Sequence, residues 1–119
     1  MKLSRLNELK PYSEDHVFKE ILPGQFIYHG GLYFSKPGER SHTNDGPKGK
    51  DYHVHNDCEA FIILQGEGEV EINKVLYPIS QGDIIVAEPG EDHHIISSIE
   101  KPVVMLWCHA GSERHKNQI

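Results

Sequence analysis

Three histidines and one glutamate are the residues of this sequence whose types and spacing best suit metal chemistry. His53 and His55 are separated by one residue, Glu59 lies four residues further on, and His93 follows the turn residues Pro89-Gly90. On a β-strand, residues two positions apart point to the same face, so both imidazoles of such a pair can reach one ion. Two imidazoles and a carboxylate form the facial ligand set of Fe(II) and related ions, which leaves coordination positions open. The spacing therefore predicts one divalent transition metal, and these N and O ligands suit Mn, Fe, Ni, Co or Zn.

Short β segments must position these residues, because the chain from Gly24 onward alternates apolar runs with turn residues. Many of the runs are rich in Val and Ile, which favour strands. In Glu69-Val70-Glu71-Ile72 charged and apolar residues alternate, which predicts that Val70 and Ile72 point inward. Residues 35–50 are rich in Gly, Pro and polar side chains and are predicted to form a long loop. The predicted strands are Phe26–Phe34, Tyr52–His55, Ala60–Leu64, Glu67–Ile72, Val75–Ile79, Ile84–Ala87, His93–Ser97 and Val103–His109.

The length of 119 residues fits a single domain, and the strand pattern predicts that this domain is all-β. We expect residues 23–111 to form the barrel. Residues 1–22 are expected to form an N-terminal arm, in which Leu3, Leu6 and Leu9 have the spacing of about one helical turn that Pro11 would end. Residues 112–119 are polar and without pattern, which predicts a flexible C-terminal tail.

The composition argues against several classes of partner. The formal net charge is -6, with 18 acidic and 12 basic residues, whereas binding to nucleic acid needs clustered cations. No apolar stretch has the length of a signal-peptide core or a membrane helix, so we expect no membrane contact and a cytoplasmic location. Cys58 and Cys108 lie far apart and form no CxxC pair, so free thiols are expected in preference to a disulfide.

The two histidine-containing segments together resemble the motifs of the cupin superfamily. The first motif, HxH followed by three residues, Glu, six residues and Gly, is matched by His53, His55, Glu59 and Gly66. The second motif is matched at Gly82, Gly90 and His93. Two positions depart from it, because Glu88 stands where the family usually has Pro and Ser97 where it often has Asn. The resemblance implies a single-domain, small antiparallel double-stranded β-helix, or jelly-roll barrel, whose metal ligands are His53, His55, Glu59 and His93.

Several functions remain open for a protein of this kind. The resemblance implies binding of a small polar molecule, such as an organic acid, a keto acid or a sugar derivative, by an enzyme of dioxygenase, decarboxylase, lyase or isomerase type. A non-catalytic metal-dependent binding or sensor module is the alternative, and no catalytic residue is assigned. The four ligand candidates could also be surface residues that bind no ion. We further expect a homodimer, because small barrels expose sheet edges and two-fold dimers are the commonest oligomers.

Other residues near the two motifs have less specific interpretations. His94 follows His93 directly and is expected on the opposite strand face, as a surface or interface residue. Cationic groups of the long loop could meet an anionic substrate, although solvated loop charges are the commoner case; they are Arg40, His42 and Lys48. Aromatic residues and two further histidines could line a cavity, but packing within the barrel is favoured; they are Tyr28, His29, Tyr33, Tyr52, Trp107 and His109.

Overall fold

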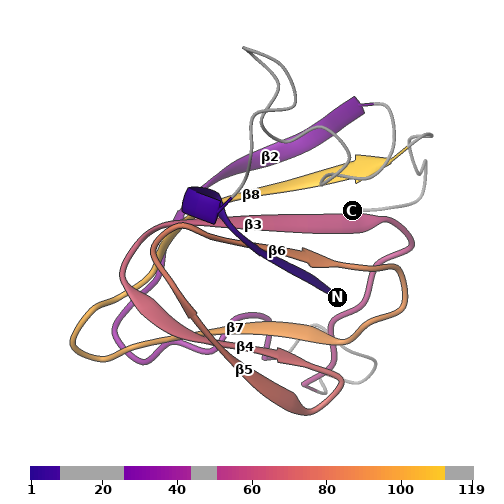
Figure 1. The fold of residues 1–119 in the computed structure, drawn as a ribbon. Coiled ribbons are helices and arrows are strands. Elements are labelled where there is room, and N and C mark those ends of the chain that lie inside the picture. The colour runs from indigo at the N-terminus through magenta and orange to yellow at the C-terminus, as the bar shows by residue number, and fades with distance from the viewer. Residues whose placement is uncertain (9–25, 44–50, 112–119) are drawn as a thin grey trace.

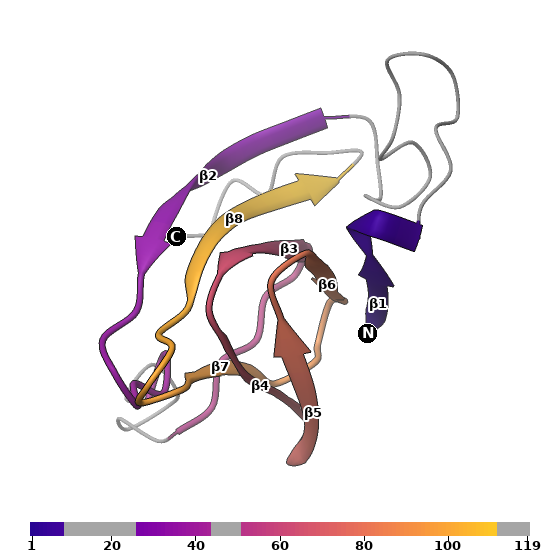
Figure 2. The same cartoon turned by 60° about the vertical axis from the view of Figure 1, so that its left-hand side comes forward.

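The computed structural model describes residues 1–8, 26–43 and 51–111, and within them eight β-strands form two antiparallel sheets that face each other (Figures 1 and 2). One sheet has the strand order β1-β6-β3-β8-β2, and the other has the order β5-β4-β7. The chain is therefore all-β, and the two-sheet jelly-roll architecture predicted from the sequence is confirmed. The strands are β1 (Lys2–Arg5), β2 (Phe26–Phe34), β3 (Cys58–Gln65), β4 (Glu67–Ile72), β5 (Val75–Ser80), β6 (Asp83–Ala87), β7 (His93–Ser97) and β8 (Val104–Gly111).

The hydrophobic core fills the space between the two sheets and follows from the two-residue period of a strand. On β3 the side chains of Phe61 and Ile63 point into this core, whereas Ala60 belongs to a separate small cluster with Val86 and Cys108 on the other face of the sheet. The predicted inward direction of the two apolar residues of β4 is confirmed by their burial. The main core consists of Phe61, Ile63, Val70, Ile72, Ile79, Ile85, Ala87, Ile95, Val103 and Met105.

The hairpin between β4 and β5 shows how local turn chemistry sets the register. Asn73 and Lys74 have φ values of 47° and 70°, and two consecutive positive φ values are the signature of a type I′ turn. This turn matches the twist of the flanking strands, so Ile72 pairs directly with Val75. The sequence analysis left these two residues as the connection between two predicted strands, and the structure confirms a turn there.

Two predicted elements are wrong. Residues 2–5 form β1, which pairs with β6 through contacts such as Leu3 with Ile85, and Leu6–Glu8 form a short 3-10 helix. A strand replaces the predicted helical turn because the edge of β6 offers backbone partners that the local leucine spacing does not reveal. Residues 52–55 contain no strand either, and their backbone contacts are described with the site below.

Parts of the predicted domain organisation lie outside the described residues, namely Leu9, most of the N-terminal arm and the C-terminal tail at 112–119, so the proposed boundaries stay a prediction. Among the residues that are described, no helix is both long and apolar enough to cross a membrane.

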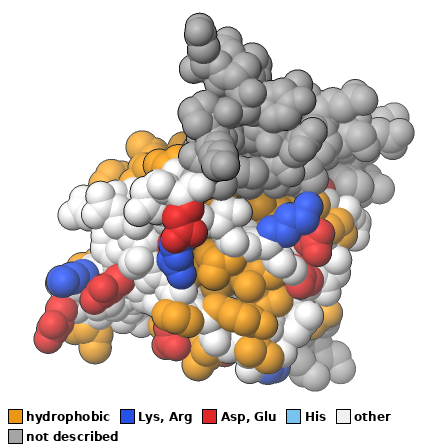
Figure 3. Space-filling model, in the orientation of Figure 1, with side chains coloured by type: hydrophobic (Ala, Val, Ile, Leu, Met, Phe, Trp, Pro, Cys, Tyr) orange, Lys and Arg blue, Asp and Glu red, His pale blue; other side chains and the backbone are white. Residues whose placement is uncertain are grey.

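Hydrophobic side chains gather in the middle of the face seen in Figure 3, over the region between β6 and β7, with charged side chains around them. On the edge strand β5, Val75 and Leu76 are about half exposed.

Gly66 connects β3 to β4 where no side chain fits. Its φ is +84°, and a Cβ built on it would lie 2.1 Å from the carbonyl oxygen of Pro102. Gly82 has a similar φ of +91°, but a Cβ there would meet nothing within 4 Å. We predict that Gly66→Ala lowers the free energy of unfolding by more than about 2 kcal/mol, since backbone strain and a backbone clash combine. Gly82→Ala should cost only the strain, about 1 kcal/mol. Urea denaturation measures both, and equal losses would contradict the steric argument.

Candidate metal centre

Glu59 is a carboxylate buried at one end of the space between the sheets. It lies two residues before Phe61 on β3 and therefore shares the inward direction of that side chain. Its backbone pairs with Ala87 of β6 on one side and with His109 of β8 on the other. Only 4% of the residue is exposed. A buried carboxylate is costly unless it is paired, so its neighbours determine what the site can do.

His93, at the start of β7, faces Glu59 from the opposite sheet. Its Nε2 lies 3.0 Å from Glu59 Oε1, and its Nδ1 lies 2.9 Å from the backbone carbonyl oxygen of Glu91. A carbonyl oxygen can only accept, so Nδ1 donates and fixes the orientation of the ring. Metal-binding histidines are held in this way by a hydrogen bond at their other nitrogen. The Pro89-Gly90 turn thus supplies both the histidine and the group that orients it.

His53 and His55 lie on an extended segment and not on the predicted strand. The backbone N–H of His93 donates to His53 O at 3.1 Å, and that of Gly90 donates to His55 O at 3.0 Å. These bonds attach the segment to the β6–β7 turn at two points, which is too few for a strand ladder. Both imidazoles nevertheless reach the same cluster, as the HxH spacing predicted.

The four predicted ligand residues come together in the structure. Their ligand atoms all lie within 4.8 Å of one another, in the group His53, His55, Glu59 and His93. Glu59 Oε1 is 3.1 Å from His55 Nε2 and 3.0 Å from His93 Nε2. Neighbouring ligands of an octahedral ion with bonds of about 2.1 Å are about 3 Å apart, so these spacings suit an ion as well as hydrogen bonds. The group could hold a metal.

The electrostatics of the cluster follow from mutual burial. Burial favours a raised pKa for Glu59, but hydrogen bonds from His55 and His93 outweigh it and hold the pKa well below its usual value. Burial lowers and the Glu59 carboxylate raises the pKa of His93, and the carboxylate prevails. Burial, with His42 and His93 nearby, lowers the pKa of His53 to about 3. His53 is therefore neutral near pH 7, as a ligand must be.

His109 and Asp57 extend the cluster and were not assigned to it from the sequence. His109 Nδ1 donates to Asp57, at 3.0 and 3.1 Å from the two carboxylate oxygens. Its Nε2 lies 3.6 Å from Glu59 Oε2, whereas His55 and His93 lie near Oε1. Both residues are buried, and they form with His55 a second group that could hold a metal. The β3–β8 register that places His109 beside Glu59 is a long-range pairing, which no local spacing in the sequence signals.

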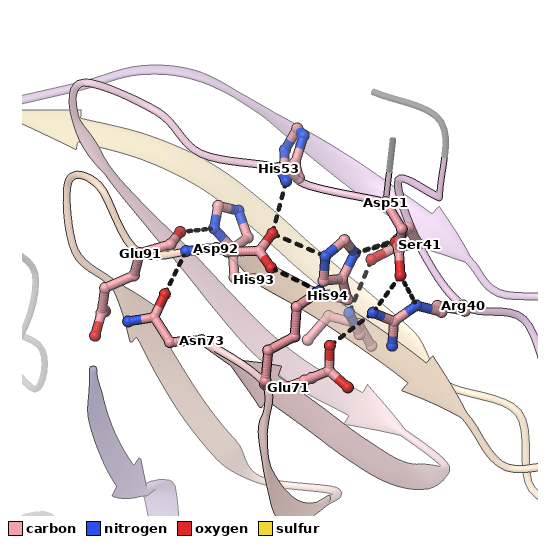
Figure 4. A network of polar contacts seen from close by, with 12 residues as sticks. Arg40, Ser41, Asp51, His53, Glu71, Asn73, Glu91, Asp92, His93 and His94 are labelled. Carbon is pink, nitrogen blue, oxygen red and sulfur yellow. Dashed lines mark hydrogen bonds and ion pairs between the residues drawn. The ribbon is translucent and has the colours of Figure 1, made fainter. Parts of the chain in front are cut away.

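His94 was predicted to be at the surface or an interface, and this is wrong because none of it is exposed. It does lie on the other face of β7 from His93, but residues 39–41 run along the edge of β7, and the carbonyl oxygen of Ser41 lies 2.8 Å from His94 Nδ1. The N–H of Ser41 donates to Ile95 O, and the N–H of Ile95 donates to the Ser41 hydroxyl. His94 is thereby enclosed in a polar network that also includes Asp92 (Figure 4).

The loop cations and the aromatic residues have mixed outcomes. Arg40 is ion-paired with Asp51 and Glu71. Its positive charge is therefore neutralised within the protein and is not directed at a substrate. The ring of His42 stacks on that of His53 with centroids 3.6 Å apart.

The predicted packing of the aromatic residues within the barrel is wrong for Tyr33 and Tyr52, which are 39% and 44% exposed. Trp107 packs against the core as predicted. Lys48 and the side chain of Tyr28 lie outside the described part of the chain.

Comparisons with known proteins place these features in a wider group. The family model described as "Cupin domain" matches residues 35–109, whereas no curated protein matches the chain. A conserved barrel domain protein from Salinispora arenicola has 17% identity over 93% of this chain and 76% of its own, with a TM-score of 0.58. A Photorhabdus luminescens protein has 24% identity over 68% of this chain and only 60% of its own, with a TM-score of 0.55. A Thermotoga maritima protein described as a predicted oxalate decarboxylase has 23% identity over 71% of this chain and 66% of its own, with a TM-score of 0.54. At these identities the three structures support the fold alone.

The coupling between Glu59 and His93 predicts a titration in the metal-free protein. We expect Glu59→Gln to lower the pKa of His93, because the negative acceptor at Nε2 is lost. The raised pKa of His93 stabilises the fold below pH 6.5, and this stabilisation disappears as the pH rises through the folded-state pKa. In Glu59→Gln this contribution of His93 to the pH dependence of stability should vanish. NMR titration of the His93 ring measures the change in its pKa, with Glu71→Gln as a control outside the cluster. An unchanged His93 pKa in Glu59→Gln would contradict the coupling between Glu59 and His93.

Proposed function

Because this chain belongs to the cupin family, we propose that it is a metal-dependent cupin that binds a small polar molecule at a centre formed by His53, His55, Glu59 and His93. The observation that carries the proposal is the convergence of three imidazoles and one carboxylate, with ligand atoms within 4.8 Å of one another. A divalent transition metal is the group that such a donor set fits.

The donor chemistry supports a resident ion in two further ways. His93 already donates Nδ1–H to a backbone carbonyl, which leaves Nε2 as the atom that faces the cluster. In the metal-free protein a proton between this Nε2 and Glu59 Oε1 balances the buried carboxylate. A metal ion would take over that role, because it neutralises the same charge and needs the same two atoms deprotonated.

The charge of the centre favours an anionic ligand. One carboxylate and three neutral imidazoles leave a net positive charge on a divalent ion, so an acid oxygen is a suitable ligand for an open position. Arg40 does not supply a second anchor, since it is bound by Asp51 and Glu71. We therefore propose an organic acid or keto acid ahead of a sugar derivative.

The chemistry of the bound molecule is proposed more broadly. The ion would supply Lewis-acid activation, or activation of oxygen if it is Fe(II), while the protein holds the ligands and excludes water. These roles fit a dioxygenase, decarboxylase, lyase or isomerase, and the decarboxylase type also occurs in the description of the Thermotoga maritima neighbour. The alternative is a binding or sensor module with the same centre. A substrate screen with each candidate metal separates turnover from binding alone.

We predict that His55→Ala and His93→Ala each abolish stoichiometric binding of a divalent metal and leave a folded barrel. A core of this size does not need the ion in order to fold, whereas the ion needs its imidazoles. Elemental analysis of untagged protein measures the metal content, and circular dichroism checks the fold. His29→Ala is the matched control, because His29 contacts the rings of Trp107 and His109 and lies outside the four-residue group. Full metal content in His55→Ala would overturn the proposed site.

The proposed quaternary state is a homodimer. Among the described strands β1, β2 and β5 lie at sheet edges, whereas residues 39–41 bond to the outer edge of β7. Strand β5 exposes Val75 and Leu76. Exposed edges and apolar side chains are commonly covered by a second copy. We predict twice the monomer mass by light scattering, and a monomer at roughly tens of micromolar would count against the homodimer.

The cytoplasmic location and the absence of nucleic-acid and membrane partners stay predictions from the sequence.

A further inference from the structure

The Asp92 carboxylate occupies a buried position between the segment that contains His53 and the start of β7. Only 3% of Asp92 is exposed. Its Oδ1 accepts the backbone N–H of His53 at 2.7 Å and lies 2.9 Å from His94 Nε2 (Figure 4). One carboxylate oxygen therefore joins the backbone of a candidate metal ligand to a fully buried imidazole on β7.

The segment that contains His53 and His55 needs such a connection. It belongs to no strand, and its backbone contacts with the β6–β7 turn are His93 N–H to His53 O and Gly90 N–H to His55 O. Asp92 adds a third contact, which is shorter than either, at the N–H of His53. With both its N–H and its C=O bonded to adjacent residues of one turn, His53 is fixed in orientation about its own backbone.

His94 holds Asp92 in place. Its Nδ1 lies 2.8 Å from the carbonyl oxygen of Ser41, and its Nε2 faces the Asp92 carboxylate. The ring of His94 is therefore held from two sides, by the carbonyl of Ser41 and by the carboxylate of Asp92. Residues 39–41, β7 and the His53 segment are thus tied together through two buried side chains.

The remaining contacts of Asp92 strengthen its position. Its backbone N–H donates to Asn73 Oδ1 at 3.0 Å, and its carbonyl accepts the N–H of Asn73 at 2.8 Å. Oδ2 lies 3.6 Å from Lys74 Nζ. Burial favours a raised pKa for Asp92, but the N–H of His53 and the charge of His94 outweigh it and lower the pKa. Oδ1 of Asp92 is therefore oriented by contacts within the protein itself.

We propose that Asp92, held by His94, is a positioning residue that sets the orientation of His53 in the metal centre. This inference rests on the proposed function of the four-residue centre and assigns a role to two residues outside it. A direct metal-binding role for Asp92 is less suitable. The group of Glu71, Asp92 and His94 is already neutralised by Arg40, which binds Glu71 at 2.6 Å, and by Lys74.

Asp92→Ala and Asp92→Asn form the test. Alanine removes the acceptor for His53 N–H, whereas asparagine retains an oxygen at the position of Oδ1. We expect Asp92→Ala to weaken Co(II) binding by roughly 10- to 100-fold and to alter the Co(II) absorption spectrum. Asp92→Asn should restore most of the affinity and the wild-type spectrum. Affinity is measured by competition with a chelator.

Asp83→Ala is the matched control for a merely structural loss. Asp83 is 2% exposed, accepts the N–H of Ser80 and pairs with Arg5, at the end of β6 opposite to Ala87. This variant should be destabilised with an unchanged Co(II) spectrum. If Asp92→Ala does not fold, Asp92→Glu, which displaces the acceptor by one methylene, replaces it and should also alter the spectrum.

A metal-free readout separates the two proposals. Amide hydrogen exchange at His53 should accelerate in Asp92→Ala, while exchange at Ile95 within β7 stays close to the wild-type rate. Wild-type protein that binds no Co(II), combined with this acceleration, would remove the proposed function and leave Asp92 as the residue that orients His53. Wild-type binding with an unchanged spectrum and affinity in Asp92→Ala would overturn the positioning role alone.

Discussion

The structure of this cupin depends on how one buried carboxylate is compensated. Glu59 points into the space between the sheets because it shares a strand face with Phe61 and Ile63, and that position removes it from water. Uncompensated, such a charge would destabilise the fold by several kcal/mol. The surrounding imidazoles offset this cost in the metal-free protein through hydrogen bonds to Oε1. The same geometry brings potential ligand atoms together, so the arrangement that stabilises the charge could also hold a metal ion.

The centre combines rigid and less rigid elements. Glu59 and His93 belong to strands, and their positions follow from sheet registers fixed along many residues. His53 and His55 belong to an extended segment that is bound to a turn at few points. Precise ligand geometry requires supporting contacts around such a segment. The Asp92–His94 pair and the stacked ring of His42 supply them, which explains why so many polar side chains are buried at this end of the barrel.

Local spacing predicted much of this fold, with characteristic exceptions. The predicted bounds of β2, β4 and β7 agree with the structure, and those of the four strands β3, β5, β6 and β8 differ from it by one or two residues at their ends. There are two exceptions: residues 52–55 were predicted as a strand and are not one, and β1 was not predicted. Both exceptions depend on partners distant in the chain. Residues 2–5 become a strand because β6 has a free edge, and residues 52–55 are not one because only a turn lies beside them.

The sequence by itself determined the chemical content of the candidate centre. The types and spacing of His53, His55, Glu59 and His93 are local properties, since a two-residue period orients the first pair and a turn presents the last. The tertiary structure alone decided which further residues surround them. Asp57, Asp92 and His109 join the cluster, and His94 is enclosed by residues 39–41, through sheet register and loop packing. Such contacts form between residues up to 54 positions apart in the chain, as between Ser41 and Ile95, and therefore leave no short-range pattern to recognise.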